Sequence, residues 1–441
     1  MQKGKSTCVI RGMLRALFVV IMVCWYSIGW SQDRGYVQRV VSVLASDSMG
    51  GRGYRDGADL RAAEYIRSEF VRHGVAPVGQ DYFQPVVFSV NSITSVNEVS
   101  VDGVALTPGE DFYISSRSRG RRAEYTLVWV DRSTLLSRRK MRRLSRSDLS
   151  GSLLVLAPDV PTDPDTRAIF RRLFWDDVTG YHKTNAAGIV YCQQRPGWQI
   201  SDSGSEQDYL VLTVRCGLVD RDSRTVVVDF GSEFVQRYRS QNVLGMIPGT
   251  QYPDSVIVFT AHYDHLGMMG DVIIPGANDN ASGTAMMLDL ARYYADHPPA
   301  WTVVFMAFTA EEAGLIGSRH YVKAPWFPLE RIVSLVNLDM VGTGSEGITV
   351  VNGSVHPTHF AKLDSINRAD SLLAEVRIRG ESPNSDHHPF HAVGVRAFFI
   401  YTMGPEHREY HNIYDRAEAL SWAGYDGLFL LLTRYAELLM R

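Results

Sequence analysis

Two apolar runs that each end in charged residues, VIVFTAHYD at residues 256–264 and TVVFMAFTAEE at residues 302–312, decide the fold of this chain. Each run has the length of a strand and lacks alternation with polar residues, so both of its faces are expected to be buried. A stretch with helical spacing, Ala281–Tyr294, separates them. Buried strands that alternate with helices are typical of an α/β sheet, whose chemistry lies in the loops that follow the strands.

The same alternation continues on either side of these runs. The further predicted strands are Val243–Ile247, Ile332–Leu338, Ile348–Val351 and Arg396–Tyr401, and the further predicted helices are Ala313–Val322, His359–Asn367 and Tyr425–Met440. Nearer the N-terminus, residues 40–44 and 62–71 show helical patterns, and Gly74 follows as a helix stop. We therefore predict an α/β protein: a three-layer αβα sandwich with a mixed sheet.

Residues 94–239 show a different pattern of short β-like runs, which predicts a β-rich domain inserted into this sandwich. The short β-like runs are Tyr125–Val130, Leu153–Leu156, Gly188–Tyr191, Tyr209–Val214 and Thr225–Phe230. Residues 32–93 and 240–441, here called the main domain, are then expected to pack together, and residues 94–239 are called the insert. The basic stretch Ser137–Arg146 is typical of a solvated helix or loop; the alternative is a site for nucleic acid or an anionic surface.

Residues 1–31 have the pattern of a secretory signal peptide. Residues 3–15 hold four positive charges and no acid, an apolar run follows from Ala16 to about Ile28, and small residues at Gly29 and Ser31 precede a cleavage site before Gln32. We therefore expect an exported protein, either periplasmic or extracellular.

Two alternatives to a cleaved signal remain. A retained membrane anchor needs about 20 apolar residues, and this run is shorter. A lipoprotein needs a small residue before the lipidated cysteine, and Val23 precedes Cys24. We expect no stable membrane span after signal removal.

The composition excludes several classes of protein. Apolar residues make up 45% and charged residues 21% of the 441, which excludes a disordered chain, a collagen and a multi-span membrane protein. The net charge is −3 and becomes −7 without residues 1–31, so no nucleic-acid partner is expected. Outside the signal only Cys192 and Cys216 remain; they can form a disulfide in an oxidising compartment or stay as two buried free thiols.

Five segments after the predicted strands carry side chains that bind metals or move protons. They are His262–Asp264, Gly276–Ala285 with Asp279, Thr309–Ser318 with Glu311 and Glu312, Asn337–Gly342 with Asp339, and Tyr410–Asp415 with His411. Each segment alone has an ordinary structural explanation, such as a helix N-cap or a strand-end histidine. Adjacent carboxylates at a buried strand end are less ordinary, because their burial is costly unless positive charge compensates them.

Taken together, two histidines and three carboxylates suit divalent metal ions. Asp279, Glu312 and Asp339 carry three negative charges, which two dications and a bridging hydroxide balance. Two metals about 3.5–4 Å apart lower the pKa of a water and stabilise the oxyanion that forms at a carbonyl. The sequence therefore predicts a two-metal centre.

The order and spacing of these segments resemble a known family. HYDHLG, PGANDNASGTA, TAEEAGLIGS, NLDMVG and REYHNIYDRAE are similar to motifs of the secreted di-zinc aminopeptidases, family twenty-eight of the metallopeptidases, with its bacterial leucyl aminopeptidases. The resemblance runs from about Gln241 to the C-terminus, and LASDSMGGRG at 44–53 and SDHHPF at 385–390 extend it. It implies the zinc exopeptidase fold, of the phosphorylase/hydrolase-like kind, and two Zn²⁺ per chain. The insert resembles a protease-associated domain in position and texture.

The resemblance also implies metal ligands at the matching positions. Asp279 bridges the two metals, Glu312 and His411 complete the ligands of one metal, and His262 and Asp339 complete those of the other. No ligand of the family is replaced in this chain.

The remaining site residues follow from the same resemblance. Glu311 is expected to act as the general base, and Tyr410 to hydrogen-bond the oxyanion. Asp264 is expected to orient His262. His265, His387 and His388 are interpreted as structural residues or as supports of the ligands.

The expected activity is removal of N-terminal residues from peptides that carry a free N-terminus. A glutaminyl cyclase, a carboxypeptidase or dipeptidase on the same scaffold, and an endopeptidase remain alternatives, and a non-catalytic binding relative is another. Manganese or cobalt suits the same ligands as zinc. Side-chain preference and oligomeric state stay open at this point.

Overall fold

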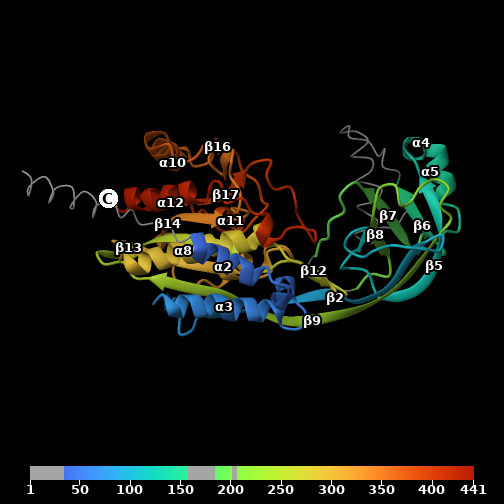
Figure 1. Cartoon of the computed structure of the whole chain (residues 1–441), viewed down its shortest axis with the longest axis horizontal. Helices are drawn as coiled ribbons and strands as arrows, with labels where there is room; N and C mark the ends of the chain where they lie inside the picture. The colour runs from blue at the N-terminus through green and yellow to red at the C-terminus, as the bar shows by residue number, and fades with distance from the viewer. Residues whose placement is uncertain (1–33, 157–183, 201–205) are drawn as a thin grey trace, which may run out of the picture.

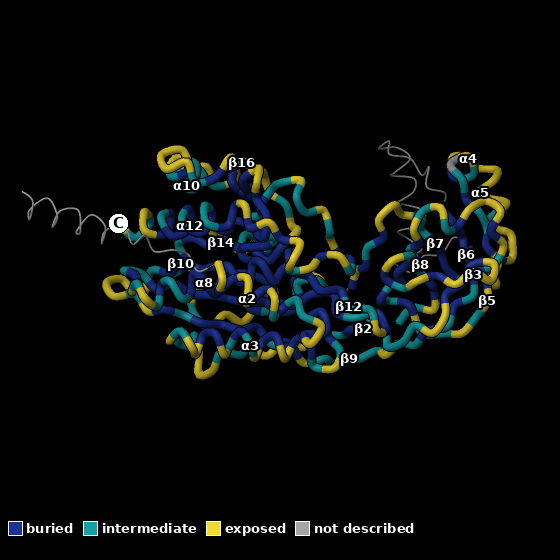
Figure 2. The backbone as a smooth tube through the Cα atoms, viewed as in Figure 1, coloured by how far each residue is buried: buried dark blue, intermediate teal, exposed yellow. Residues whose placement is uncertain are grey.

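The computed structural model describes residues 34–156, 184–200 and 206–441, which form two lobes (Figure 1). The main domain lies on the left of the figure and the insert on the right, and two long strands, β2 (Phe83–Val101) and β9 (Thr225–Ile247), run between them. Buried backbone is found inside both lobes (Figure 2). The predicted signal peptide, residues 1–31, lies outside the described residues.

The sheet of the main domain has the order β16-β15-β17-β14-β10-β13-β9. Its central strands β13 (Trp301–Phe308), β10 (Tyr252–His262), β14 (Ile332–Leu338) and β17 (Ala397–Met403) are parallel to one another. By contrast, β9 is antiparallel to β13, and β15 (Gly347–Val351) is antiparallel to β17 but parallel to β16 (Val376–Ile378). The predicted mixed sheet is confirmed.

Helices cover both faces of this sheet because successive strand residues point to opposite sides. Ile257 and Phe259 of β10 pack in one cluster with α2 (Arg34–Leu44), α3 (Ala58–Arg72), α8 (Gly283–Asp296) and α12 (Tyr425–Leu439). Val256 and Val258 pack in another with α9 (Ile316–Lys323) and α11 (His387–Ala392). The helix α10 (Pro357–Asp370) packs beside α12. The predicted three-layer αβα sandwich is therefore confirmed.

The insert continues the same sheet, because β9 passes from one lobe into the other. Beyond β9 the strand order is β5 (Arg121–Val130), β6 (Ser152–Leu156), β7 (Gly188–Gln193), β8 (Leu210–Arg215) and β4 (Phe112–Ile114). The strands β5 to β8 are parallel, whereas β5 with β9 and β4 with β8 are antiparallel. The small strand β3 (Val104–Ala105) pairs with the end of β2, and β1 (Ala76–Pro77) pairs with β9.

The prediction of separate strands at Thr225–Phe230 and Val243–Ile247 is wrong, because both belong to β9. Residues 231–242 between them pair with residues 84–95 of β2 and are mostly partly exposed. They are too polar to show the alternation that reveals a half-buried strand. The expected domain boundaries near residues 94 and 240 fall inside β2 and β9, so the chain crosses between the lobes within continuous strands.

Several short elements differ from the predicted pattern. The helix expected from Ala281 begins as α8 at Gly283, after a π-helical turn, η3 (Ala277–Ser282). The strand β16 and the helix α11 are too short for periodicity to reveal. The hairpin of β11 (Gly267–Met269) and β12 (Val272–Ile274) follows directly after the HYDHLG segment.

The basic stretch Ser137–Arg146 forms an exposed helix, α5 (Arg138–Leu144), after the short helix α4 (Arg132–Leu136). The predicted solvated helix is confirmed. In the described part of the chain, none of the helices has both the length and the apolar character needed to cross a bilayer.

Cys192 and Cys216 are free, partly buried thiols in the insert. Burial, followed by the neighbouring Cys216, raises the pKa of Cys192 to about 11. Only the thiolate is a good nucleophile, so at pH 8 Cys192 in the native protein should react with iodoacetamide on the order of 10²-fold more slowly than in the unfolded chain. Mass spectrometry of alkylated peptides measures both rates. A peptide that joins Cys192 to Cys216 through a disulfide contradicts the free-thiol structure.

Candidate metal centre

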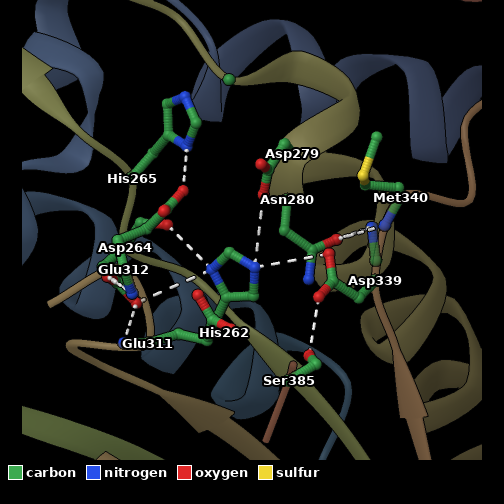
Figure 3. A network of polar contacts seen from close by, with 12 residues as sticks. His262, Asp264, His265, Asp279, Asn280, Glu311, Glu312, Asp339, Met340 and Ser385 are labelled. Carbon is green, nitrogen blue, oxygen red and sulfur yellow. Dashed lines mark hydrogen bonds and ion pairs between the residues drawn. The ribbon is translucent and has the colours of Figure 1, made fainter. Parts of the chain in front are cut away.

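The candidate residues meet at one edge of the sheet because the parallel strands end there together. His262 is the last residue of β10, and Asp339 follows the last residue of β14. Glu311 and Glu312 come shortly after β13, in a turn that leads to α9. Figure 3 shows these side chains converging on the imidazole of His262.

The imidazole of His262 lies between two carboxylates. Its Nε2 is 3.3 Å from Asp279 Oδ1 and 3.4 Å from Asp339 Oδ1. Burial acts to lower the pKa of His262, but the carboxylates of Asp339 and Glu311 outweigh it, and the pKa is raised well above its usual value. With its Nε2 directed at two carboxylates, the ring can supply a nitrogen ligand to a divalent cation.

Asp279 is shared between two histidines. Its Oδ1 faces His262, and its Oδ2 lies 3.1 Å from Nε2 of His411. The turn that carries Asp279 is held by Asp415, whose carboxylate accepts hydrogen bonds from the backbone N–H groups of Asn278 (2.8 Å) and Asp279 (3.0 Å). This carboxylate can therefore bridge two cations without moving its backbone.

Glu312 stands on the side of Asp279 away from Asp339. Its Oε2 is 3.3 Å from Nε2 of His411, and its Oε1 is 2.8 Å from Nδ1 of His265. Burial acts to raise the pKa of Glu312, but His411 and His265 outweigh it and lower the pKa to about 2. His265 thus lies directly beside a candidate ligand, in line with the interpretation that it supports one.

Asp339 is oriented by a chain of hydrogen bonds that crosses the sheet. The hydroxyl of Ser385 donates to Asp339 Oδ2 at 2.7 Å, and the amide of Asn337 donates to Ser385 Oγ at 2.8 Å. Thr260 in turn donates to Asn337 Oδ1 at 2.6 Å. Ser385 opens the SDHHPF segment, so that segment reaches the site through its serine.

The two histidines of SDHHPF differ in burial. His387 is fully buried and packs on Phe399, with 5.5 Å between ring centroids. Neither of its ring nitrogens has a hydrogen-bond partner among the described residues, and burial lowers its pKa to about 3. His388 is only partly buried, and its Nδ1 also has no such partner there.

Asp264 touches His262 chiefly through its backbone. The Nδ1 of His262 lies 3.1 Å from the backbone carbonyl oxygen of Asp264, whereas the carboxylate oxygen is 3.7 Å away. That carboxylate instead accepts the backbone N–H groups of Glu311 (3.1 Å) and Glu312 (3.3 Å) and the hydroxyl of Tyr54. Asp264 therefore fixes the turn with both glutamates as well as the imidazole.

Glu311 differs from the other carboxylates because its side chain has no hydrogen-bond partner among the described residues. Burial and then the charges of Glu312, Asp386 and Asp339 raise its pKa well above the usual value, although His262 opposes the shift. A carboxylate that is free of partners and has a raised pKa is suited to accept and return a proton.

Tyr410 stacks on His411, with ring centroids 3.7 Å apart and an angle of 18° between the planes. The residue is 51% exposed. Burial of part of the side chain and then the carboxylates of Asp279 and Glu312 hold the pKa of Tyr410 above its usual value, so its hydroxyl is a hydrogen-bond donor at neutral pH.

The donor set fits metal ions. Ligand atoms of His262, Asp279 and Glu312 lie within 4.8 Å of one another, and so do those of His262, Glu311 and Asp339. Largely buried carboxylates repel one another unless cations compensate them. Imidazole and carboxylate ligands suit zinc and similar divalent ions.

Arg52, in the LASDSMGGRG segment, was not singled out by the sequence. Its guanidinium is fully buried beneath the site, and it donates to the backbone carbonyl oxygens of Leu44, Tyr263, Pro275, Gly276 and Asp279 at 2.7–3.3 Å. Burial lowers its pKa to about 10, against the opposing carboxylates of Asp279 and Asp415, so it stays charged at neutral pH. A single arginine in a Gly-rich segment offers no local signal that it binds distant backbone carbonyl groups.

Fold and donor set together define an α/β protein with a candidate centre for divalent metals. Residues 242–436 match the model of peptidase family M28. Among curated proteins the chain is 36% identical over 191 residues to Aminopeptidase YwaD of Bacillus subtilis, which is 41% of either chain. It is 39% identical over 113 residues to a probable zinc metalloprotease of Pyrenophora tritici-repentis, 24% of this chain and 23% of that one. The chain thus spans less than half the length of these relatives. Over residues 242–436 the chain is therefore similar to peptidase family M28.

Two solved structures share the whole architecture. BSAP, a zinc aminopeptidase from Bacillus subtilis, superposes with a TM-score of 0.66 and 21% identity over 92% of this chain and 95% of that chain. A peptidase M28 precursor from Shewanella amazonensis gives a TM-score of 0.70 and 17% identity over 93% and 94%. At these identities the comparison establishes the fold, and it includes the insert as well as the main domain.

We predict that Arg52→Lys lowers the free energy of unfolding by on the order of 2–4 kcal/mol. One ammonium has three donors and no planar fork, so at least two buried carbonyl groups lose their partner. Urea unfolding followed by circular dichroism measures the change. Arg61→Lys is the matched control, since Arg61 is exposed although it also binds backbone carbonyls, of Ser48 and Asp56; it should change stability by about 0.5 kcal/mol or less. Equal stability of both variants contradicts this role.

Proposed function

We propose that the protein is a zinc-dependent aminopeptidase, which hydrolyses the first peptide bond of peptides with a free N-terminus. One observation carries the proposal: the carboxylate of Asp279 lies between His262 and His411, with one oxygen facing each ring. That arrangement suits a carboxylate shared by two cations. The relatives named an aminopeptidase and a zinc metalloprotease support the same reading.

Under this proposal the ligands divide into two sets around Asp279. His411 and Glu312 would hold one cation, since Nε2 of His411 lies 3.3 Å from Oε2 of Glu312. His262 and Asp339 would hold the other, since Nε2 of His262 lies 3.4 Å from Oδ1 of Asp339. When bound, two such ions supply Lewis-acid polarisation of a carbonyl and lower the pKa of a water. The rest of the chemistry belongs to the chain's own side chains.

Glu311 is proposed as the general base. Its partner-free carboxylate lies close to ligand atoms of His262 and Asp339, so it can take a proton from the attacking water. It then returns that proton to the nitrogen of the leaving amine. The carboxylate of Asp264 accepts a 3.1 Å hydrogen bond from the backbone N–H of Glu311. This bond fixes the position of the turn that carries the base and the neighbouring ligand Glu312.

Tyr410 is proposed to donate its hydroxyl hydrogen to the oxyanion that forms at the scissile carbonyl. Stacking on His411 limits the orientations of the ring, and about half of the residue remains exposed towards solvent, where a substrate can reach it.

The proposal includes an exported location, periplasmic or extracellular, on the basis of the signal-like pattern in residues 1–31. N-terminal sequencing of the protein recovered from outside the cytoplasm tests it. A mature chain that begins at Gln32 supports the proposal, and an uncleaved Met1 contradicts cleavage.

The proposed base is tested by substitution of Glu311. With aminoacyl-4-nitroanilides, Glu311→Gln should lower kcat by about 10²- to 10⁴-fold, because a carboxamide cannot accept the proton. Zinc content should stay at two ions per chain by elemental analysis, because Glu311 is not among the proposed ligands. Glu330→Gln, at an exposed position in the short helix η4 (Leu329–Arg331), is the matched control and should retain wild-type kcat.

The same assay tests the activity class. N-blocked substrates should not be cleaved, and a chelator should abolish cleavage until zinc is added back. Two zinc ions per chain without cleavage of either substrate overturns the aminopeptidase proposal. Glutaminyl cyclisation and dipeptide hydrolysis are then the reactions to assay.

The proposed oxyanion donor is tested by substitution of Tyr410. Tyr410→Phe should lower kcat by roughly 10- to 10²-fold with little change in KM, since the hydroxyl acts on the transition state. Tyr414→Phe is the control, because Tyr414 lies in the same loop and is also 51% exposed. A rise in KM with unchanged kcat for Tyr410→Phe shows instead that the hydroxyl binds the substrate's ground state.

A further inference from the structure

The insert reaches into the candidate metal centre through Trp198, in the loop between β7 and β8. The backbone N–H of Trp198 donates to the carbonyl oxygen of His411 at 2.7 Å. The Nδ1 of His411 lies 3.1 Å from the carbonyl oxygen of Trp198 and donates to it. Two residues that are 213 positions apart in the sequence are thus joined by a reciprocal pair of hydrogen bonds.

These two hydrogen bonds determine the orientation of the His411 ring and which of its nitrogens faces the site. Because Nδ1 is used by Trp198, Nε2 is the nitrogen left to face Asp279 at 3.1 Å and Glu312 at 3.3 Å. A histidine ligand generally needs such a partner on its second nitrogen to fix its tautomer and ring orientation. The backbone of His411 also has a φ of +56°, which is rare for a residue with a side chain and persists only where neighbours hold it.

Trp198 is itself firmly anchored in the insert. It is only 2% exposed, and its indole N–H donates to the backbone carbonyl oxygen of Ile114 in β4 at 2.7 Å. The preceding residue is Gly197, where a Cβ atom would lie 3.3 Å from the carbonyl oxygen of His411 and 3.4 Å from that of Tyr410. A glycine therefore permits the close approach of the two loops.

Hydrophobic packing also connects the insert to the loops of the candidate site. One buried cluster combines insert residues with apolar residues that neighbour the site residues in sequence. Its members from the insert include Phe112, Ile114, Trp198 and Ile200, and its members from the site loops include Leu266, Ala310 and Ala313, while the partly buried Ile413 packs against it. These four residues of the site loops lie within two positions of His265, Glu311, Glu312 and His411. The ligand loops of the main domain therefore pack on the core of the insert.

We propose that Trp198 is a positioning residue for His411, so that the insert sets the affinity of one of the two metal positions, the one formed by His411 and Glu312. This inference rests on the proposed function, because it assumes that His411 binds a metal. The insert is then a structural part of the metal centre, and loss of its contact should weaken one metal position selectively.

The test is metal titration of the full chain after chelator treatment. Zinc affinity is measured by competition with a chromophoric chelator, and the ligand field is followed by the visible absorption of bound Co²⁺. Trp198→Ala keeps the backbone groups that hydrogen-bond His411 but removes the indole that anchors them to Ile114. The looser loop should weaken one of the two metal positions by about 10- to 100-fold and leave the other unchanged. The kcat of this variant should return towards the wild-type value in excess zinc, and Trp198→Phe, which keeps the ring in the cluster, should regain most of the lost affinity.

Trp129→Ala is the matched control. Trp129 is a partly buried tryptophan in β5 of the same insert, and its indole N–H has no hydrogen-bond partner among the described residues. It should bind both metals as the wild type does. A weakening of both positions in both variants shows a general effect of the insert's stability and overturns the selective role of Trp198.

The outcomes separate the two proposals. If the wild-type chain fails to bind two metals, the proposed function fails. If it binds two and a folded Trp198→Ala binds both with wild-type affinity, only the positioning role is overturned. If Trp198→Ala does not fold, Gly197→Ala decides, because its added methyl group pushes directly on His411 and Tyr410. Weaker binding at one position then supports the inference, and wild-type affinity at both overturns it.

Discussion

Repulsion between buried carboxylates is the constraint that the rest of the structure accommodates. Parallel strands bring their carboxyl ends to one edge, and in this chain those ends carry Asp339 and the pair Glu311 and Glu312. Negative charges crowded away from water are stable only where positive charge or hydrogen-bond donors surround them. The imidazoles of His262 and His411 face these carboxylates, and the negative charge raises the pKa of both rings despite their burial.

The surroundings of the site follow from this constraint. Arg52 adds a permanent buried charge and ties together five backbone carbonyl groups below the ligands. Asp264 and Asp415 are themselves acidic, yet they are stabilised by backbone N–H groups and in return fix the turns that carry Glu311, Glu312 and Asp279. Among the described base and ligand residues, the carboxylates of Asp279, Glu312 and Asp339 have side-chain hydrogen-bond partners and that of Glu311 has none, which separates the proposed base from the proposed ligands.

Continuous strands and a shared hydrophobic cluster connect the two lobes, although the pattern of the sequence changes between them. The strands β2 and β9 continue from one lobe into the other, and a hydrophobic cluster packs insert residues against the loops of the site. The insert therefore does more than extend the chain. Its resemblance to a protease-associated domain stays a prediction, whereas its contact with His411 is a feature of this structure.

Where sequence patterns failed, the cause was a contact made by residues far apart. Polar residues 231–242 lack a strand period because β2 supplies their pairing, so β9 was divided into two. The turn at Ala277–Ser282 departs from a plain helix start because Asp415 holds its N–H groups. The roles of Arg52, Ser385 and Trp198 have no local signal, since their partners are backbone groups or side chains from other parts of the chain.

By itself, the sequence determined the alternation of strands and helices and the chemical types of the site residues. Both are local properties, because apolar period and residue identity need no partner to be recognised. Only the tertiary structure decided which atoms meet: that Asp279 stands between two imidazoles, that Asp264 reaches His262 mainly through its carbonyl oxygen, and that the insert provides the partner of His411. The physical reason is that hydrogen bonds and charge pairs act over a few ångströms, so they depend on the spatial neighbours that folding creates.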